Sequence, residues 1–282
     1  MSIPKRMLLG LLGSPISHSA APAMMEAAGA SAGLDIRYHL IDVPGADEAM
    51  ISRILDGVRV IGFAGINVTF PYKQAVIPFL DAMDPGAAQI GAVNLVTVRG
   101  RKLTGHNTDS TGFLAGLQAK IGSAVKAGPA VLIGAGGAGR AIAWSLAKAG
   151  VPEVLVVDQD PSRAASLAQE ASGWGGGRFV PASGIAAAME HAVGVVNATP
   201  AGMLPDRSSP VDPSLLRAGM WVADAVYHPP VTPLLAAAKA LGCTIMTGRA
   251  MSVGQAEDGF ALFTGRRAPP GLIGDAFDAH VK

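Results

Sequence analysis

The sequence predicts an α/β protein with two domains. Short apolar runs alternate with helix-forming segments along most of the chain, a pattern typical of parallel sheets with helices on both faces. At 282 residues the chain is long enough for two separate cores. A third observation is the glycine-rich segment at residues 134–139, which directly follows an apolar run and marks the second domain.

The first 109 residues predict one α/β domain. Strands are expected at 7–12, 36–41 and 63–68, and helices at 21–32, 46–55 and 74–80, from the spacing of their apolar residues. Segments 92–98 and 102–105 favour a hairpin. Because parallel strands end at one edge of a sheet, polar residues after these strands are the first candidates for a ligand site.

The second domain is expected over residues 110–246. It begins with a helix at 111–120, and its strands are predicted at 130–133, 154–157, 194–198, 221–225 and 244–246. Helices are predicted at 140–148, 162–171 and 233–240, with a loop at 173–177. Residues 247–282 form a C-terminal helical segment, with a helix at 251–263, that we expect to pack back on the first domain. A ligand cleft is expected between the two domains.

Composition excludes several classes of protein. Half of the residues are hydrophobic and 15% are charged, which argues against disorder, and the net charge of +1 gives no basic field for nucleic acid. The single cysteine, Cys243, excludes an intramolecular disulfide and a multi-cysteine zinc site. No apolar run has the length of a membrane span, and residues 5–15 lack a signal-peptide cleavage pattern. We therefore expect a cytoplasmic monomer or homodimer without membrane or nucleic-acid partners.

The segment from Val131 to Gly139 predicts a dinucleotide site. It places Gly134, Ala135, Gly136, Gly137, Ala138 and Gly139 between a strand and a helix, and Asp158 ends the next strand, 19 positions after the last glycine. Glycines let the backbone approach a pyrophosphate, and the N-terminus of the helix offers backbone N–H groups with a partial positive charge. The acid accepts hydrogen bonds from the adenosine ribose. This order predicts a Rossmann-type domain.

Asp158 also indicates which dinucleotide binds. Its carboxylate would repel a 2′-phosphate, and neither Gln159 nor Asp160 is basic. Arg163 is the nearest cation; we count it among the candidate cofactor contacts, although its expected place is the first turn of the helix after Pro161. The sequence therefore predicts NAD rather than NADP.

Two charged residues, one in the polar segment 67–73 and one in the polar segment 105–109, have simple structural explanations. Lys73, after Pro71, is either a solvated residue at a helix start or a positioned catalytic cation. Asp109, taken alone, fits an N-cap for a helix that follows Ser110. No pair of histidines has metal-ligand spacing within a helix, so no metal is expected.

Taken together, the polar motifs resemble the shikimate dehydrogenase family. They are Asn67-Val-Thr-x-Pro-x-Lys73, Gly91-Ala-Val-Asn94, Gly105-His-Asn-Thr-Asp109, Gly134-Ala-Gly-Gly-Ala-Gly139, Asn197-Ala-Thr-Pro-x-Gly-Met203, Asp224-x-Val-Tyr227 and Gly248-x-x-Met251-x-x-x-Gln255-Ala, in family order. The Gly-His-Asn-Thr-Asp form and the acid at 158 resemble the quinate/shikimate dehydrogenases that use NAD, as do Val253-Gly-Gln-Ala and Phe263-Thr-Gly.

The resemblance implies a role for each matching residue. Lys73 and Asp109 would form a catalytic dyad that exchanges the proton of a ring hydroxyl while hydride goes to the nicotinamide. The substrate, a cyclic polyhydroxy carboxylate, would contact Ser19, Asn67, Thr69, Asn94, Tyr227 and Gln255, with the backbone near Asn107. Ser17 lies outside the family pattern and is counted as a further candidate contact to substrate. Thr199 and Gly248 would join the glycine-rich loop, Asp158 and Arg163 in binding the cofactor.

One departure from the family pattern leaves the substrate open. Ser19-Ala-Ala21-Pro22 aligns with a Ser-x-Ser/Thr-Pro pattern, so Ser19 matches the first carboxylate-binding hydroxyl while Ala21 replaces the second. A lost charge-assisted hydrogen bond costs roughly 1.5–3 kcal/mol. Ala21 therefore leaves open a paralogue that oxidises a different ring alcohol. A separate alternative, of a different class, is a non-catalytic NAD sensor, although a sensor would not need the Lys73–Asp109 pair.

Overall fold

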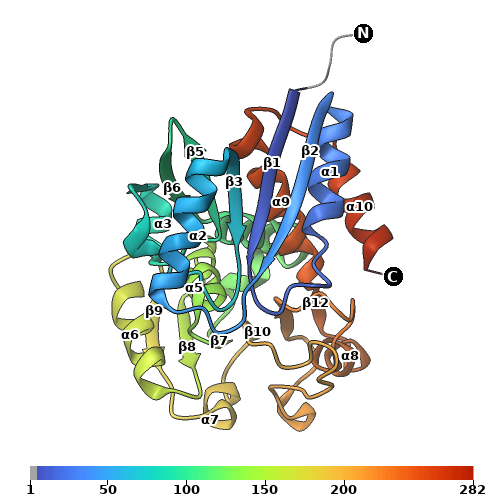
Figure 1. Ribbon diagram of the computed structural model, residues 1–282. Helices are drawn as coiled ribbons and strands as arrows, with labels where there is room; N and C mark the ends of the chain where they lie inside the picture. Colours follow the sequence, from blue (N-terminus) through green and yellow to red (C-terminus); the bar gives the residue numbers. More distant parts are fainter. Residues whose placement is uncertain (1–4, 282) are drawn as a thin grey trace. The chain divides into compact units, whose positions relative to one another are not determined.

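The structure is a computed structural model that describes residues 5–281 and divides into two units (Figure 1). Unit 1 comprises the residues up to Thr108 together with those from Gln255 onward, and unit 2 comprises Asp109–Gly254. Each unit is built on its own six-stranded sheet with helices packed against it. The two α/β units confirm the predicted fold class.

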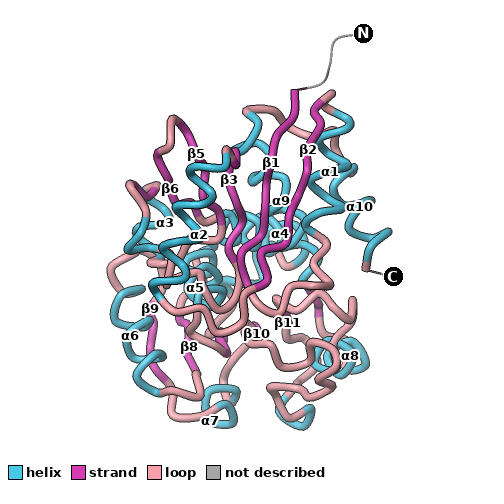
Figure 2. Tube along the Cα trace, viewed as in Figure 1, coloured by secondary structure: helices cyan, strands magenta, loops and turns pink. Residues whose placement is uncertain are grey.

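Unit 1 contains a mixed sheet with strand order β2-β1-β3-β5-β6-β4. Its successive elements are β1 (Lys5–Gly13), α1 (Ala21–Ser31), β2 (Leu34–Asp42), α2 (Glu48–Ile61), β3 (Phe63–Val68), the 3₁₀ turn η1 (Ile77–Phe79), β4 (Ala82–Met83), α3 (Pro85–Ile90), β5 (Leu95–Arg99) and β6 (Lys102–His106). The strand β1 runs parallel to β2 and β3, whereas β5 pairs antiparallel with both β3 and β6. The predicted hairpin is β5–β6 (Figure 2).

Helices cover both faces of the unit 1 sheet. On one face α2 buries Ile51, Leu55 and Val58 against Leu12 and other strand residues. On the opposite face Gly29 of α1 packs on Ile36, and Phe263 packs on Gly65. Phe263 belongs to α9 (Gly248–Thr264), a helix that starts in unit 2 and ends in unit 1, and α10 (Leu272–His280) then packs along α1.

Unit 2 contains an all-parallel sheet with the strand order of a Rossmann domain. Its elements are α4 (Thr108–Lys120), η2 (Gly122–Lys126), β7 (Ala130–Ile133), α5 (Gly137–Ala149), β8 (Glu153–Val157), α6 (Pro161–Ala171), β9 (Arg178–Pro181), α7 (Ile185–Met189), β10 (Gly194–Asn197), η3 (Pro213–Leu215), β11 (Trp221–Asp224), α8 (Pro233–Ala240) and β12 (Thr244–Met246). The order β9-β8-β7-β10-β11-β12 reverses between β7 and β10. Ligands bind such sheets at that reversal, outside the carboxyl ends of the strands.

The core of unit 2 has two layers because its central strands β7, β10 and β11 are buried on both faces. One layer joins Phe113, Ile142 and Leu167 of helices α4, α5 and α6 to the sheet. The other contains Met189 and Leu234 of helices α7 and α8. This arrangement explains why the strands are near-continuous apolar runs rather than alternating ones.

The predicted helix at Gln74–Leu80 is wrong. These residues form turns, followed by the short 3₁₀ turn η1. Pro78 lacks a backbone N–H and its ring clashes with the preceding turn, so the apolar residues at helical spacing cannot propagate an α-helix. The expectation that Asp109 caps a helix from the outside is also wrong, because α4 already begins at Thr108 and includes Asp109 in its first turn.

Several short elements of the structure were not predicted. The helix α3 begins at Pro85 after Asp84, whose carboxylate accepts the N–H groups of Gly86 and Ala87. Aspartate followed by proline is a common helix start. The strands β4 and β9 and the helices α7 and α10 were likewise not predicted. Within residues 5–281 no helix is long and apolar enough to cross a membrane, and no group of three or more metal-ligating side chains occurs.

Candidate functional site

Backbone hydrogen bonds join three polar segments of unit 1 at the ends of its strands. The N–H of Ser14, after β1, donates to the carbonyl of Phe70, after β3, at 3.0 Å. The N–H of Val93, just before β5, donates to the carbonyl of Lys73 at 2.8 Å. The segments that carry Ser17, Thr69, Lys73 and Asn94 are therefore neighbours, although the sequence separates them by up to 77 positions.

Asn94 is a buried amide fixed by the residue that precedes Asp109. Its Oδ1 accepts the backbone N–H of Thr108 at 2.7 Å, and its Nδ2 lies 3.0 Å from Thr108 Oγ1. Asn107 Nδ2 donates to the carbonyl of Ala92 at 2.9 Å, which closes the same turn. Because both Oδ1 and Nδ2 of Asn94 are hydrogen-bonded to Thr108, Asn94 connects the polar strand ends of unit 1 to the first residue of α4.

Asn67, at the end of β3, extends this network. Its Nδ2 lies 3.4 Å from the carbonyl oxygen of Asn94, and its Oδ1 accepts the hydroxyl of Tyr38 at 2.8 Å. Burial raises the pKa of Tyr38 far above its usual value, so the hydroxyl stays protonated and acts as a donor. Sequence reasoning missed Tyr38; the available signal was a tyrosine within an apolar strand, since a buried tyrosine hydroxyl needs a partner.

The segment between β1 and α1 carries the hydroxyls that the sequence predicts for a carboxylate. Ser17 is exposed, whereas Ser19 is half-buried and its Oγ accepts the N–H of Ala21 at 3.2 Å, at the start of α1. Asp42 accepts the N–H of Ile16 at 3.2 Å and holds the segment to the end of β2. Ala21 itself is buried, with 8% of its surface exposed.

In unit 2 the glycine-rich loop closes tightly on the helix that follows it. Gly134 adopts a left-handed backbone with φ of 101°. A Cβ on Gly139 would lie 1.9 Å from the carbonyl oxygen of Gly134, so only glycine allows this approach. The helix α5 begins at Gly137 without a side-chain cap, and this leaves its first-turn N–H groups for an anion. The loop thus fits the pyrophosphate of a dinucleotide.

Asp158 is bound directly to this loop. Its Oδ2 accepts the N–H of Ala135 at 2.7 Å, and its Oδ1 accepts the N–H of Asp160 at 2.9 Å. Each carboxylate oxygen keeps a second lone pair. The acid therefore has the capacity to bind ribose hydroxyls while it holds the loop. Arg163, in the first turn of α6, lies 3.7 Å from the carboxylate of Asp160.

A second buried network lies at the ends of β10 and β11. Asn197 Oδ1 accepts the N–H and hydroxyl of Thr199, and its Nδ2 donates to Asp224 at 3.0 Å. Asp224 also accepts the hydroxyl of Thr232 at 2.7 Å and the N–H of Val226. Burial raises the pKa of Asp224 to about 6, against the lowering effect of these three donors. Thr199 packs beside Gly134, at the point where the strand order reverses.

The remaining predicted residues lie on separate elements. Tyr227 is half-buried in the segment after β11. Gly248 begins α9, and a Cβ there would lie 2.5 Å from the carbonyl oxygen of Val226. Gln255 is a half-buried residue of α9 that belongs to unit 1, and Asp109 is a buried residue of α4 that belongs to unit 2.

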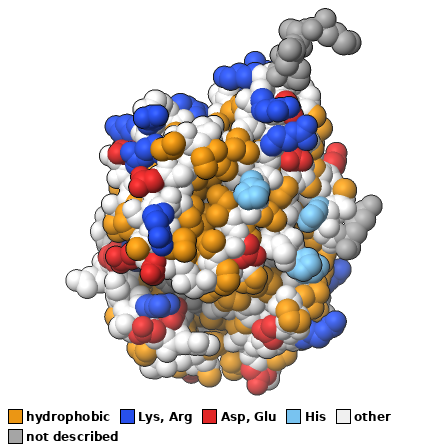
Figure 3. Space-filling view, in the orientation of Figure 1, with side chains coloured by type: hydrophobic (Ala, Val, Ile, Leu, Met, Phe, Trp, Pro, Cys, Tyr) orange, Lys and Arg blue, Asp and Glu red, His pale blue; other side chains and the backbone are white. Residues whose placement is uncertain are grey.

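The structure also contains a groove that the sequence did not indicate. It has a volume of about 400 Å³, lies over β1, β2 and β3 of unit 1, and is lined by Leu8, Glu26, Arg37, Tyr38, His39 and Phe63. Apolar side chains gather on this face of unit 1 (Figure 3). None of the predicted site residues lines this groove.

The fold and these sites define the class of protein. A Rossmann unit with a glycine-rich loop closed by an acid, and a second α/β unit with a polar strand-end network, are typical of an oxidoreductase that uses a nicotinamide dinucleotide. The model for the shikimate dehydrogenase substrate binding domain matches residues 11–96, and the model for the coenzyme F420-dependent NADP oxidoreductase matches residues 130–218.

Comparison with curated relatives then gives the family. The chain is 45% identical to the quinate/shikimate dehydrogenase (NAD(+)) of Corynebacterium efficiens, over 92% of this chain and 93% of that one. It is 41% identical to the shikimate dehydrogenase (NADP(+)) of Moorella thermoacetica, over 94% and 90% of the two chains. The protein belongs to the shikimate dehydrogenase family, and the predicted resemblance is confirmed.

Solved structures agree with this assignment. Quinate dehydrogenase from Corynebacterium glutamicum in complex with NAD is 41% identical, with a TM-score of 0.87 and coverage of 98% of this chain and 99% of that chain. The ligand-free 5-ketofructose reductase of Gluconobacter sp. strain CHM43 is 34% identical, with a TM-score of 0.81 and coverage of 98% and 99%. Proteins named for different substrates thus share this fold.

Proposed function

We propose that the protein is an NAD-dependent dehydrogenase that interconverts a ring hydroxyl and a ketone on shikimate, quinate or both. The observation that carries the proposal is the buried Asn67–Asn94 network, joined by the backbone to Lys73. Neutral amides and hydroxyls recognise the hydroxyl positions of a polyol without adding charge. The relatives named for quinate and shikimate, at more than 40% identity, support the same substrates.

Each candidate residue has a defined task in this proposal. When bound, NAD supplies the hydride acceptor. Lys73 exchanges the proton of the reacting hydroxyl, and the Asp109 carboxylate holds the lysine in place. Asn67 and Asn94 orient the ring by hydrogen bonds to its other hydroxyls, and Thr69, Tyr227 and Gln255 complete the contacts to substrate. Ser19, and Ser17 beside it, bind the carboxylate.

We propose NAD rather than NADP because of Asp158. A 2′-phosphate on the adenosine ribose would lie beside a carboxylate already bound to the glycine-rich loop. Asp160, two residues further on, adds a second negative charge. The charge of Asp158 is the feature that supports this preference, since the curated relatives include enzymes named for both cofactors.

The direct test is initial-rate absorbance at 340 nm with shikimate and quinate, each combined with NAD and NADP. Turnover with NAD that exceeds turnover with NADP supports the proposed reaction and cofactor. NAD binding without turnover of any alcohol would instead favour a nucleotide-binding sensor. In that case the Lys73–Asp109 dyad is the part of the proposal that fails.

A second candidate is a dehydrogenase for a different polyol. Ala21 removes one expected carboxylate-binding hydroxyl, and the similar 5-ketofructose reductase is named for a substrate outside the shikimate series. The discriminating experiment adds 5-ketofructose with NADH and NADPH to the panel and compares wild type with Ala21→Ser. If the carboxylate is the natural ligand, shikimate or quinate turnover exceeds that of 5-ketofructose in wild type. If the natural ligand has no such carboxylate, Ala21→Ser supplies the missing hydroxyl and raises shikimate or quinate turnover by roughly 10-fold.

A further inference from the structure

Tyr38 reaches a site residue across an intervening strand. In the sheet of unit 1, Tyr38 on β2 lies opposite Leu9 of β1, and Asn67 on β3 lies opposite Leu11. The tyrosine side chain therefore crosses β1 diagonally, between Leu9 and Leu11, before its hydroxyl donates to Asn67 Oδ1 at 2.8 Å. Tyr38 and Asn67 are both buried, with 9% and 5% of their surfaces exposed.

This hydrogen bond is the shorter of the two that hold the amide of Asn67. The other, from Nδ2 to the carbonyl oxygen of Asn94, is 3.4 Å long, and that oxygen also accepts the N–H of Val68 at 2.8 Å. Among the described residues, the second Nδ2 hydrogen of Asn67 has no acceptor. While Oδ1 of Asn67 faces the Tyr38 hydroxyl, one N–H of Nδ2 therefore remains for a ligand. This N–H is available only in that orientation of the amide.

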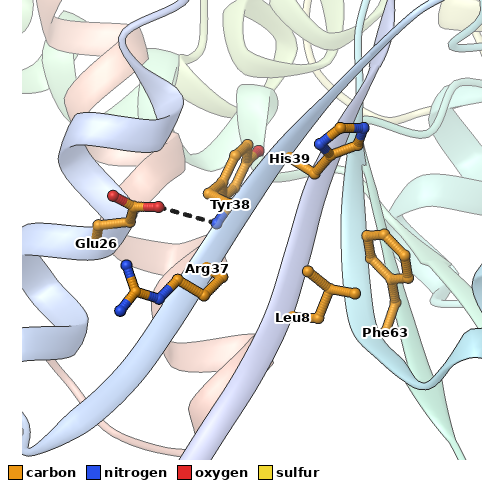
Figure 4. Close-up of a pocket in the computed structure, with 6 residues that line it drawn as sticks. All are labelled: Leu8, Glu26, Arg37, Tyr38, His39 and Phe63. Atoms are coloured by element: carbon orange, nitrogen blue, oxygen red, sulfur yellow. Dashed lines mark hydrogen bonds between the residues drawn. The ribbon is translucent and has the colours of Figure 1, made fainter.

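The backbone of Tyr38 is fixed independently of its ring. The strand β2 is an edge strand, and Glu26 reaches from α1 to accept the Tyr38 N–H at 3.0 Å (Figure 4). Arg37 and His39, the neighbours along the strand, line the groove on the other face. A single residue thus connects α1, the edge of the sheet and the polar network.

We infer that Tyr38 is a positioning residue that sets the orientation of the Asn67 amide and thereby its hydrogen bond to a substrate hydroxyl. The inference rests on the proposed function for the identity of the ligand. Without the Tyr38 hydroxyl, the buried Asn67 oxygen loses its donor and the amide keeps only the longer bond. Recognition of the ring substrate should weaken, whereas NAD recognition, assigned to unit 2, should not.

Steady-state kinetics of Tyr38→Phe, Asn67→Ala and the double variant test this inference. For Tyr38→Phe we expect the KM of the ring substrate to rise about 10-fold, the KM of NAD to change less than about twofold, and kcat to fall less than the KM rises. In the Asn67→Ala background, Tyr38→Phe should change kcat/KM less than about twofold, because the tyrosine acts through the amide. Equal effects in both backgrounds would overturn the inference.

Tyr72→Phe is the matched control. Its hydroxyl is also hydrogen-bonded in unit 1, but to backbone atoms of Val43 and Ala46 and to no amide of the site. It should lower thermal stability by a similar amount and leave the KM of the ring substrate unchanged. A rise in KM that is equal in Tyr72→Phe and Tyr38→Phe would indicate general destabilisation and would contradict the inference.

A measurement without turnover separates this inference from the proposed function. The side-chain amide signals of Asn67 in ¹⁵N-labelled protein, assigned by their loss in Asn67→Ala, should shift in Tyr38→Phe and keep their positions in Tyr72→Phe. If they respond in this way while wild type turns over neither shikimate nor quinate, the proposed function fails and the positioning role stands. If they do not respond to Tyr38→Phe, the positioning role is refuted whatever the activity.

Discussion

The two units present different chemical groups at the ends of their strands. In unit 1 the groups are the side-chain amides of Asn67, held by the hydroxyl of Tyr38, and of Asn94, held by the backbone N–H of Thr108. In unit 2 the loop after β7 offers backbone N–H groups, and one carboxylate, Asp158, holds it. Side-chain amides can form hydrogen bonds that depend on the positions of a ligand's hydroxyls, whereas backbone N–H groups bind a phosphate that is common to many nucleotides. Substitutions in the two units should therefore have separable effects.

The largest expected effect tests that separation directly. Lys73→Met removes the group proposed to exchange the hydroxyl proton and should lower kcat by about 10²–10⁴-fold. The affinity for NAD, measured by fluorescence titration, should stay within about twofold of wild type because the cofactor site is assigned to unit 2. A variant that keeps most of its turnover would exclude Lys73 from the chemistry.

A second prediction contrasts the neutral network of unit 1 with the acidic network of unit 2. The pKa of Asp224 is raised to about 6 by burial, so the native state binds a proton more tightly than the unfolded chain. This contribution to stability is present below the unfolded pKa and is lost as pH rises from about 4 through 6. From the shift in pKa it amounts to about 3 kcal/mol.

Thermal unfolding at pH 4.5 and pH 7.5 provides the measurement. Between these values wild type should lose stability relative to Asp224→Asn, which has no proton to release. The stability change of Tyr38→Phe should be the same at both pH values, because the hydroxyl of Tyr38 stays protonated throughout. A difference between wild type and Asp224→Asn that is independent of pH would contradict the raised pKa.

The third prediction concerns the backbone of the glycine-rich loop. A Cβ at Gly139 would lie 1.9 Å from the carbonyl oxygen of Gly134, and the loop must shift to accommodate it. Gly139→Ala should weaken NAD binding by about 2 kcal/mol, roughly 30-fold, as measured by calorimetry. Gly184→Ala in the same unit, where a Cβ would meet open space, is the control and should bind NAD like wild type. Equal affinities in the two variants would show that the loop tolerates a side chain.

The smallest expected effect concerns cofactor choice. Asp158→Asn removes the negative charge and keeps a side-chain oxygen able to accept the N–H of Ala135. The ratio of kcat/KM for NAD over NADP should fall by about 10-fold, about 1.4 kcal/mol, through a gain with NADP. The control is Asp212→Asn in the same unit, an exposed acid that caps η3, which should leave the ratio unchanged. An unchanged ratio in Asp158→Asn would mean that other residues exclude the 2′-phosphate.

The sequence predicted the nucleotide loop because its parts are close along the chain. Gly134, Gly139 and Asp158 belong to one strand–helix–strand segment, so their spacing alone indicates their contact. The hydrogen bond between Tyr38 and Asn67 spans 29 positions and depends on β1 inserting between β2 and β3, which no local pattern reveals. The wrong helix at Gln74–Leu80 has a local cause, since Pro78 interrupts a segment whose apolar residues have helical spacing.

The path of α9 determines when unit 1 is completed during synthesis. Phe263, from the end of this helix, packs on Gly65, and Arg99 binds the carbonyl oxygens of Leu262 and Phe263. These partners are translated after the whole of unit 2. A nascent chain that has reached Gly254 therefore holds all residues of unit 2, while the sheet of unit 1 still lacks one of its coverings. On the ribosome, the unit that begins first is the one that finishes last.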